Sequence, residues 1–156
     1  MGGGVITDLG GFAASTYMRG MSFVNVPTTL LAMVDAGTGG KNGIDYGGLK
    51  NIVGTFSLPQ KTIIDTRFLR TLPYDQLLSG FAEMLKHALI ADPKHLNELL
   101  SFDLEQAYEQ HNWGTDFQRL LQTSLDIKQA IIENDPTEDI DVMLVCLQCF
   151  FLGRLQ

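Results

Sequence analysis

The alternation of apolar and polar positions predicts an α/β arrangement in the first part of the chain. Residues 21–26 ("MSFVNV") and 61–66 ("KTIIDT") are short runs rich in β-branched and aromatic side chains, which are typical of strands. Between them, "LLAMVDA" follows Thr28 and Thr29, whose hydroxyl side chains favour the start of a helix. A further helix is expected within residues 12–20.

From residue 74 onward the pattern changes to the three- and four-residue spacing of helices. It predicts one helix over about 74–91 and a second over about 94–110. A third helix is expected to be capped by Asp116 and stopped by Asn134-Asp135-Pro136. The predicted fold class is therefore a glycine-rich α/β part followed by an all-helical part.

Glycine is concentrated in the first part, because 13 of the 16 glycines fall within residues 1–54. Residues 36–48 are expected to form a glycine-rich loop, and the pattern of residues 47–56 favours a solvated loop. A loop that loses so much conformational entropy on folding usually needs unusual backbone angles or the close approach of a ligand. We therefore expect a ligand near these glycines.

The formal net charge of −7 is unevenly spread, with +1 over residues 1–90 and −8 over residues 91–156. An acidic surface argues against non-specific nucleic-acid binding, and single basic residues among glycines suit a small anionic ligand better. The apolar run 140–152 is too short to span a bilayer, and no secretory signal is visible. Cys146 and Cys149 have no second pair, so we expect reduced thiols in a cytoplasmic protein.

Two glycine-rich stretches are candidate binding features. The triplet Gly2-Gly3-Gly4 could bring backbone amides against a pyrophosphate, but a plain tight turn is an equal alternative. Residues 34–45 ("VDAGTGGKNGID") are similar to a P-loop but lack its first glycine and its Ser or Thr. They still present Asp35 and Lys41 on a glycine backbone, and we favour a ligand role there.

The stretch "GFAEMLKHALIAD" (80–92) is a third candidate. On a helix, Glu83, Lys86 and His87 share one face, and the spacing alone favours an ordinary surface ion pair. Glu83 and His87 could instead reach one metal ion if a third ligand came from elsewhere. His95 and His111, the other histidines, lack partners at ligand spacing and are expected to be solvated.

Taken together, these stretches resemble 3-dehydroquinate synthases, of the sugar-phosphate cyclase group related to glycerol-dehydrogenase-like metal enzymes. The matching motifs are "GGGVITDLGGFAASTYMRG", "VPTTLLAMVDAGTGGKNGID", "GLKNIVGTF", "IIDTRFLRTLP" and "GFAEMLKHALI", with a fainter continuation in "SLDIKQAIIENDPTE". They cover residues 2–92 almost continuously.

The resemblance implies a central fragment of a two-domain enzyme that uses NAD and a divalent metal, zinc or cobalt. In that family, a seven-carbon keto-acid phosphate (DAHP) is transiently oxidised by NAD, loses phosphate, is reduced again and closes to 3-dehydroquinate. A homodimer and a small sugar-acid phosphate substrate are implied as partners, with neither nucleic acid nor membrane. Residues 1–74 would end the NAD-binding domain, residues 75–138 would begin the helical metal domain, and residues 139–156 are an atypical tail such as a frameshift produces.

The resemblance also implies roles for individual residues. The positions that match NAD contacts are Gly2, Gly3, Gly4, Asp8, Thr28, Thr29, Asp35, Lys50, Thr71 and Leu72. The positions that match substrate contacts are Lys41, Asn51, Lys86 and Arg19, the last contributed across the dimer interface. Glu83 matches the carboxylate metal ligand, whereas His87 matches no functional position.

One departure from the family pattern leaves alternatives open. The family's other two metal ligands are histidines in later stretches, and no histidine follows His111. The alternatives are another sugar-phosphate cyclase, a metal-dependent polyol dehydrogenase of the same superfamily, or a non-catalytic NAD-binding remnant.

Overall fold

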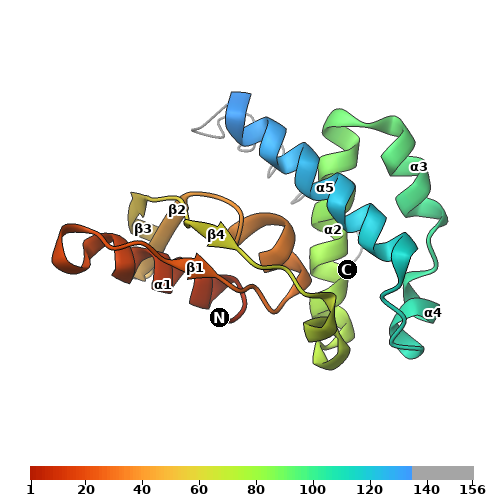
Figure 1. Ribbon diagram of the computed structural model, residues 1–156, viewed down its shortest axis with the longest axis horizontal. Coiled ribbons are helices and arrows are strands. Elements are labelled where there is room, and N and C mark those ends of the chain that lie inside the picture. The colour runs from red at the N-terminus through yellow and green to blue at the C-terminus, as the bar shows by residue number, and fades with distance from the viewer. Residues whose placement is uncertain (135–156) are drawn as a thin grey trace.

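A computed structural model of the protein describes residues 1–134. The elements are α1 (Gly4–Thr16), the 3₁₀ turn η1 (Tyr17–Arg19), β1 (Val24–Asn25), the π-helical turn η2 (Ala32–Ala36), β2 (Lys41–Tyr46), β3 (Leu49–Phe56), β4 (Lys61–Thr62), the 3₁₀ segment η3 (Thr66–Thr71), α2 (Tyr74–Ala91), α3 (Pro93–Ser101), α4 (Leu104–Glu109) and α5 (Thr115–Asn134). Figure 1 shows α1 and the strands on one side, α2 to α4 on the other, and α5 reaching back from α2 toward the strands. The predicted α/β part followed by helices is confirmed.

The first helix begins earlier than the pattern predicted. It starts at Gly4 rather than near residue 12, with Gly3 in an extended conformation as its N-cap. The glycine triplet therefore leads directly into a helix, and its interpretation as a plain tight turn is wrong. The backbone of Gly2 pairs with the segment after β1, since Gly2 N–H donates to Val26 (3.1 Å) and Thr28 N–H donates to the Gly2 carbonyl (2.9 Å).

The strands form two separate pairs within the described residues. β1 and β4 run parallel, with Val24 opposite Lys61, and are much shorter than the predicted runs. β2 and β3 form an antiparallel hairpin, so the prediction of loops over residues 36–48 and 47–56 is wrong for residues 41–46 and 49–56. Gly47 and Gly48 connect these strands with φ of 62° and 79°, the left-handed region that a two-residue hairpin turn requires and glycine adopts readily.

The predicted helices after residue 74 are largely confirmed. α2 has the expected bounds, but the expected helix over 94–110 is divided into α3 and α4. The division occurs at Asp103, whose carboxylate accepts the Gln106 N–H at 2.9 Å and so caps a new helix. α5 starts at Thr115, which puts Asp116 in the first turn rather than at the cap.

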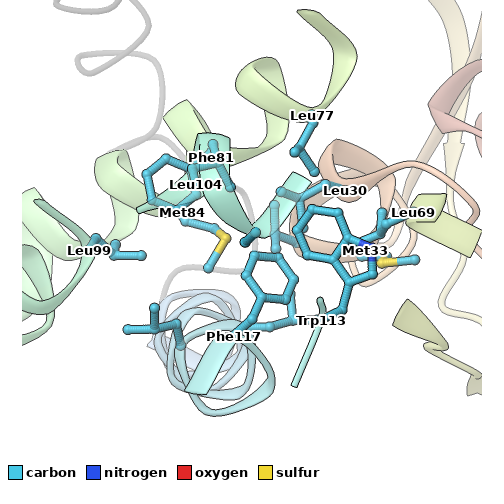
Figure 2. Packing of buried hydrophobic residues seen from close by; sticks show 14 of the residues in the cluster. Leu30, Met33, Leu69, Leu77, Phe81, Met84, Leu99, Leu104, Trp113 and Phe117 are labelled. Atoms are coloured by element: carbon cyan, nitrogen blue, oxygen red, sulfur yellow. The ribbon is translucent and has the colours of Figure 1, made fainter. Parts of the chain in front are cut away.

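One hydrophobic core lies among the helices and extends to the segment around η2. Figure 2 shows Met33 and Leu69 from the first part meeting Met84, Trp113 and Phe117 from the second. Burial of this apolar surface is the main favourable contribution to the fold. The hairpin contributes no residue to the cluster, so it depends on α1 and on local hydrogen bonds.

No helix of the described part of the chain is both long and apolar enough to cross a membrane. The predictions for the run 140–152, for Cys146 and Cys149, and for the tail 139–156 lie outside the described residues. The domain boundary near residue 75 stays a prediction.

Candidate functional site

The start of α1 has the properties of an anion site. Gly3 gives no side-chain cap, so the amides of the first turn are not covered by a side chain of the cap residue. A Cβ at Gly2 would lie 2.6 Å from Ile6 Cβ, and one at Gly3 would lie 3.0 Å from Thr29 Cγ2. Helix N-termini with close backbone access bind phosphate groups, so these residues fit the pyrophosphate of a dinucleotide such as NAD.

Thr28 and Thr29 connect this helix start to η2. Thr29 Oγ1 accepts the Ala32 N–H at 3.2 Å, which confirms the predicted capping role of Thr29. Asp35 lies within η2 and is about 41% exposed. The triplet, the two threonines and Asp35 thus come from adjacent segments.

The hairpin of β2 and β3 provides the basic and amide side chains of the candidate site. A cavity of about 330 Å³ is lined by Asp8 of α1 together with residues of β2 and β3, among them Lys41 and Asn51. Lys50 lies close enough to Asp8 to lower the pKa of that carboxyl. These four sequence-predicted residues are therefore near one another.

Asn51 is held in an unusual backbone conformation. Its φ is 54°, and Asp45 Oδ1 accepts its backbone N–H at 2.8 Å, next to a register shift between Ile44 and Tyr46. Non-glycine residues with positive φ are uncommon and cluster at functional sites. The irregular hairpin therefore directs Asn51 in a way that a regular strand would not.

Asp8 has a strongly altered titration. Burial raises the pKa of Asp8 to about 6, repulsion from Asp35 adds to the rise, and Lys50 partly opposes it. A raised carboxyl pKa in a cleft is typical of functional sites.

The cluster on α2 is buried, contrary to the surface ion pair that spacing alone favoured. Lys86 Nζ lies 2.8 Å from Glu83 Oε1, and His87 Nε2 lies 3.4 Å from the same oxygen. The side chains of Lys86, Glu83 and His87 are 11%, 4% and 1% exposed. Burial alone would raise the pKa of Glu83, but the neighbouring His87 and Lys86 outweigh it and lower that pKa.

The residues present fit a divalent metal only in part. Glu83 is a suitable oxygen ligand and lies beside an imidazole. However, residues 1–134 contain no group of three His, Cys, Asp or Glu side chains placed to hold a metal ion. A three-ligand catalytic site is therefore not assembled in the described part of the chain.

Arg19, Thr71 and Leu72 are not among the residues that line the cavity beside Asp8. Arg19 is exposed at the end of η1, with a φ of 69° after Met18 at 48°. Thr71 ends η3, and the side chain of Leu72 is buried in the core, so only the backbone of Leu72 can face a ligand.

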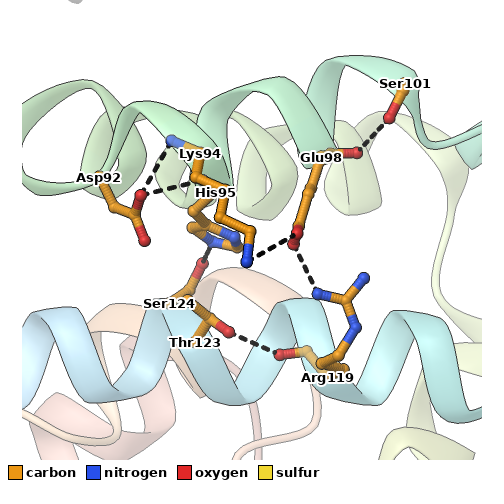
Figure 3. A network of polar contacts seen from close by, with 8 residues as sticks. All are labelled: Asp92, Lys94, His95, Glu98, Ser101, Arg119, Thr123 and Ser124. Carbon is orange, nitrogen blue, oxygen red and sulfur yellow. Dashed lines mark hydrogen bonds and ion pairs between the residues drawn. The ribbon is translucent and has the colours of Figure 1, made fainter.

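The sequence interpretation missed Lys128 and misplaced His95. Lys128 is 1% exposed and its Nζ lies 3.0 Å from Asp35 Oδ1, which connects α5 to the candidate site. Its position seven residues after the buried Leu121 was the available signal. His95, expected to be solvated, is buried and its Nε2 lies 2.9 Å from Ser124 Oγ, which joins α3 to α5 (Figure 3).

The fold is shared with solved synthases, two of which were determined with NAD+ and a divalent metal bound. A 2-epi-5-epi-valiolone synthase from Streptomyces hygroscopicus subsp. jinggangensis 5008, solved with NAD+ and Zn2+ bound, superposes with a TM-score of 0.82 at 36% identity over 89% of this chain and 38% of that one. A 2-deoxy-scyllo-inosose synthase complexed with carbaglucose-6-phosphate, NAD+ and Co2+ gives a TM-score of 0.67 at 27% identity over 85% of this chain and 35% of that one. Both neighbours are synthases with NAD+ and a divalent metal bound, and the fold of the described residues is that of this class of protein.

Sequence comparison narrows this class to one family. The family model described as 3-dehydroquinate synthase N-terminal matches residues 1–79, and the one described as 3-dehydroquinate synthase C-terminal matches residues 80–145. The chain belongs to the 3-dehydroquinate synthase family.

Curated relatives agree with this assignment. A 3-dehydroquinate synthase of Parabacteroides distasonis is 46% identical over 88% of this chain and 38% of its own length. One of Sulfolobus acidocaldarius is 43% identical over 93% of this chain and 40% of its own length. The chain therefore spans about two-fifths of the length of the relatives it matches.

Proposed function

We propose that this chain forms the second half of an NAD site and one wall of the substrate site of a 3-dehydroquinate synthase. The reaction would be conversion of DAHP to 3-dehydroquinate with loss of phosphate, a lyase step toward the aromatic amino acids in the cytoplasm. Within this proposal, residues 1–74 belong to the NAD-binding domain and residues 75–138 to the metal and substrate domain. The relatives support the choice of family, and the geometry around Asp8 supports the proposed site.

A single observation supports the proposal most strongly. Asp8, Lys41 and Asn51 line one cavity, although they come from α1, β2 and β3. The start of α1 lies on the same helix as Asp8, one turn before it. An uncapped helix start next to an ammonium and an amide is suited to a ligand that has a pyrophosphate and carries further anionic groups.

The proposed roles follow from these positions. The pyrophosphate would bind at the glycine triplet, Gly2, Gly3 and Gly4. The rest of NAD would be contacted by Asp8, Thr28, Thr29, Asp35, Lys50, Thr71 and Leu72. Lys41, Asn51 and Lys86 would bind and orient the substrate. When bound, NAD would supply reversible oxidation of a substrate hydroxyl.

Two further roles depend on groups beyond the described residues. Arg19, exposed on η1, would reach the substrate phosphate of a second subunit in a homodimer. Glu83 would be the carboxylate ligand of a zinc or cobalt ion in the full-length enzyme. The described residues hold no three-ligand set for that ion.

Other cyclase chemistry is the second candidate. This candidate is supported by the superposition of the chain on the valiolone synthase, which is a cyclase with a different product. A metal-dependent polyol dehydrogenase, or a non-catalytic NAD-binding remnant, would share the glycine triplet and Lys50 but would release no phosphate from DAHP.

The first experiment is a calorimetric titration of the 156-residue chain with NAD. Saturable binding of one NAD per chain is expected, and Lys50→Met should weaken it about tenfold, the loss expected for one charged contact. Lys61→Met is the matched control, because Lys61 is an exposed lysine on β4 outside the cavity. Absence of NAD binding to the folded chain would contradict the proposal.

The second experiment compares substrates. Phosphate release is measured with DAHP and with other sugar phosphates, and oxidation is measured with glycerol. Release from DAHP alone supports the proposed reaction. Release from other sugar phosphates only indicates another cyclase, and NAD binding without turnover indicates the remnant.

A further inference from the structure

We propose that Asn42 is a positioning residue of the candidate site, which fixes the backbone on both sides of Lys41 and so keeps the Lys41 ammonium beside the cavity at Asp8. The inference rests on the proposed function, in which Lys41 binds the anionic substrate. Asn42 is not among the positions that match family contacts, yet its side chain is only 7% exposed and lines the same cavity.

The Asn42 amide closes a ring of hydrogen bonds at the open end of the hairpin. Its Nδ2 donates to the Gly40 carbonyl at 3.0 Å and to the Ser57 carbonyl at 2.7 Å. The Ser57 backbone N–H donates to the same Gly40 carbonyl at 2.8 Å. The residue before Lys41 is thus tied both to the residue after it and to the end of β3.

The chain before Lys41 makes this support necessary. Lys41 follows Gly39 and Gly40, and glycine loses more conformational freedom on folding than any other residue. The hydrogen bond from Asn42 to Gly40 spans Lys41, so it restricts the backbone angles that Lys41 can adopt. Because a lysine ammonium sits on a flexible four-carbon stem, a fixed backbone limits the region that the ammonium can reach.

Asn42 also determines where the hairpin lies on α1. Its Oδ1 lies directly against Gly11, so that a side chain at Gly11 would displace it. Gly11 is buried and lies three residues after Asp8, on the same side of the helix. The contact at Gly11 therefore brings Asn42, and Lys41 with it, to the part of α1 that carries Asp8.

A second contact between α1 and the hairpin provides a matched control. Ser15 Oγ of α1 and Thr55 Oγ1 of β3 lie 2.7 Å apart. Neither residue is next to Lys41 in the sequence. Loss of this hydrogen bond in Ser15→Ala should loosen the hairpin on α1 without freeing the Lys41 backbone, which separates general support of the hairpin from positioning of Lys41.

The first measurement is the NMR order parameter of the Lys41 backbone amide in the 156-residue chain without ligand. A rigid value of about 0.85 is expected for the unmodified chain and for Ser15→Ala, and a value below about 0.6 for Asn42→Ala. The double variant Gly11→Ala/Asn42→Ala fills the vacated space on α1. It should therefore regain melting temperature relative to Asn42→Ala, but not the order at Lys41, because the two donated hydrogen bonds are still missing.

The second measurement is the affinity for DAHP, by calorimetry of the NAD-saturated chain. Lys41→Met and Asn42→Ala should each weaken binding about tenfold, the loss expected for one charged contact. Lys41→Met/Asn42→Ala should bind no more weakly than Lys41→Met alone, because Asn42 acts through Lys41. Ser15→Ala should bind DAHP as the unmodified chain does.

Three results would overturn the proposal: unchanged order at Lys41 in folded Asn42→Ala, equal losses of DAHP affinity in Asn42→Ala and Ser15→Ala, or additive losses in Lys41→Met/Asn42→Ala. If Asn42→Ala does not fold, Gly11→Ala/Asn42→Ala takes its place in both measurements. Failure of the proposed function gives a different result. An unmodified chain that binds no DAHP would contradict that function, whereas the order parameter at Lys41 would still decide the role of Asn42.

Discussion

The ammonium of Lys128 on α5 lies 3.0 Å from the carboxylate of Asp35 on η2. The lysine side chain is 1% exposed, whereas the aspartate is 41% exposed. The pair therefore joins α5, the last described helix, to the predicted NAD site. Because only the lysine is buried, we expect the loss of folding stability to depend on which of the two side chains is replaced.

Replacement of Asp35 should be the more costly change at this pair. Asp35→Asn removes one carboxylate from a buried ammonium, and we expect a loss of about 2 kcal/mol, as for a hydrogen bond to a charged group. Lys128→Met keeps the apolar stem packed and returns Asp35 to water, so a loss of about 1 kcal/mol is expected. Urea unfolding of both variants measures the difference. Arg67→Met, which breaks an exposed ion pair with Asp65, is the control and should change little. Equal losses at Asp35 and Lys128 would contradict the assigned burial.

Adjacent glycines of α1 should respond in opposite directions to alanine. A Cβ at Gly10 meets nothing within 4 Å, so Gly10→Ala should add about 0.5–1 kcal/mol of stability through helix propensity. A Cβ at Gly11 would lie 1.8 Å from Asn42 Oδ1. The Asn42 amide donates to the Ser57 carbonyl at 2.7 Å and to the Gly40 carbonyl at 3.0 Å, which holds it in place.

Gly11→Ala is therefore expected to lose about 1–3 kcal/mol through overpacking. Thermal unfolding of the two single variants side by side gives the comparison. Stabilisation by both alanines would show that α1 does not approach β2 as closely as described.

Asn51 should tolerate glycine better than a β-branched residue. Its φ of 54° is unstrained for glycine, so Asn51→Gly should keep the stability within about 0.5 kcal/mol. Asn51→Val should lose about 1–2 kcal/mol at the same position. Chemical denaturation checks the order, and similar stability of the two variants would argue against the left-handed conformation. Because Asn51→Gly is expected to fold, a loss of substrate binding in the folded variant reports on the missing amide.

The pKa of Asp8 should make the fold less stable as pH rises. The folded pKa of about 6 lies above the ordinary value of 3.8, so the folded chain binds this proton more tightly than the unfolded chain. The contribution is full below about 3.8 and is lost as pH rises through about 6. Asp8→Asn should remove this slope, and Lys50→Met should raise the pKa of Asp8 further, because Lys50 lowers it. Carboxyl NMR titration measures the pKa, and a value near 4 would contradict the prediction.

The pKa of His95 should make the fold less stable as pH falls, which is opposite to the effect of Asp8. Burial lowers the pKa of His95 below its ordinary 6.5, and Asp92 and Glu98 only partly oppose this. The unfolded chain then binds the proton more tightly, so the stability from neutral His95 is full above about pH 6.5 and is lost as pH falls. His95→Gln should flatten the decline between pH 7 and pH 5 in urea unfolding. Lys94→Gln, an exposed change on the same helix, should leave the decline intact.

Local signals predicted the helical part well. The bounds of α2 and the cap at Thr29 follow from residues close in sequence, and the structure confirms both. The hairpin was missed because β3 is exposed along nearly its whole length and the one buried residue of β2 is the polar Asn42, so neither strand shows a clear alternation of apolar and polar residues. The two glycines between Tyr46 and Leu49 were the available signal, since such pairs favour two-residue hairpin turns.

Non-local contacts explain the remaining differences. The burial of His95 depends on Ser124, and that of Lys128 depends on Asp35, which is far away in the sequence. The sequence also predicted a surface ion pair for the α2 cluster, which is buried. Spacing along one helix does not reveal which of its faces other helices cover. The resemblance indicated a role for Glu83 but gave no reason to expect a buried imidazole beside it.

The hairpin has a consequence for the order of folding. β2 and β3 are joined by two glycines already suited to the turn, so closing this loop costs little entropy and takes on the order of microseconds. The meeting of Asp35 and Lys128 must close a loop spanning most of the described chain, which is a slower event. The basic and amide groups of the hairpin would therefore be in place before α5 reaches η2, and the arrival of α5 would be a late step in shaping the site.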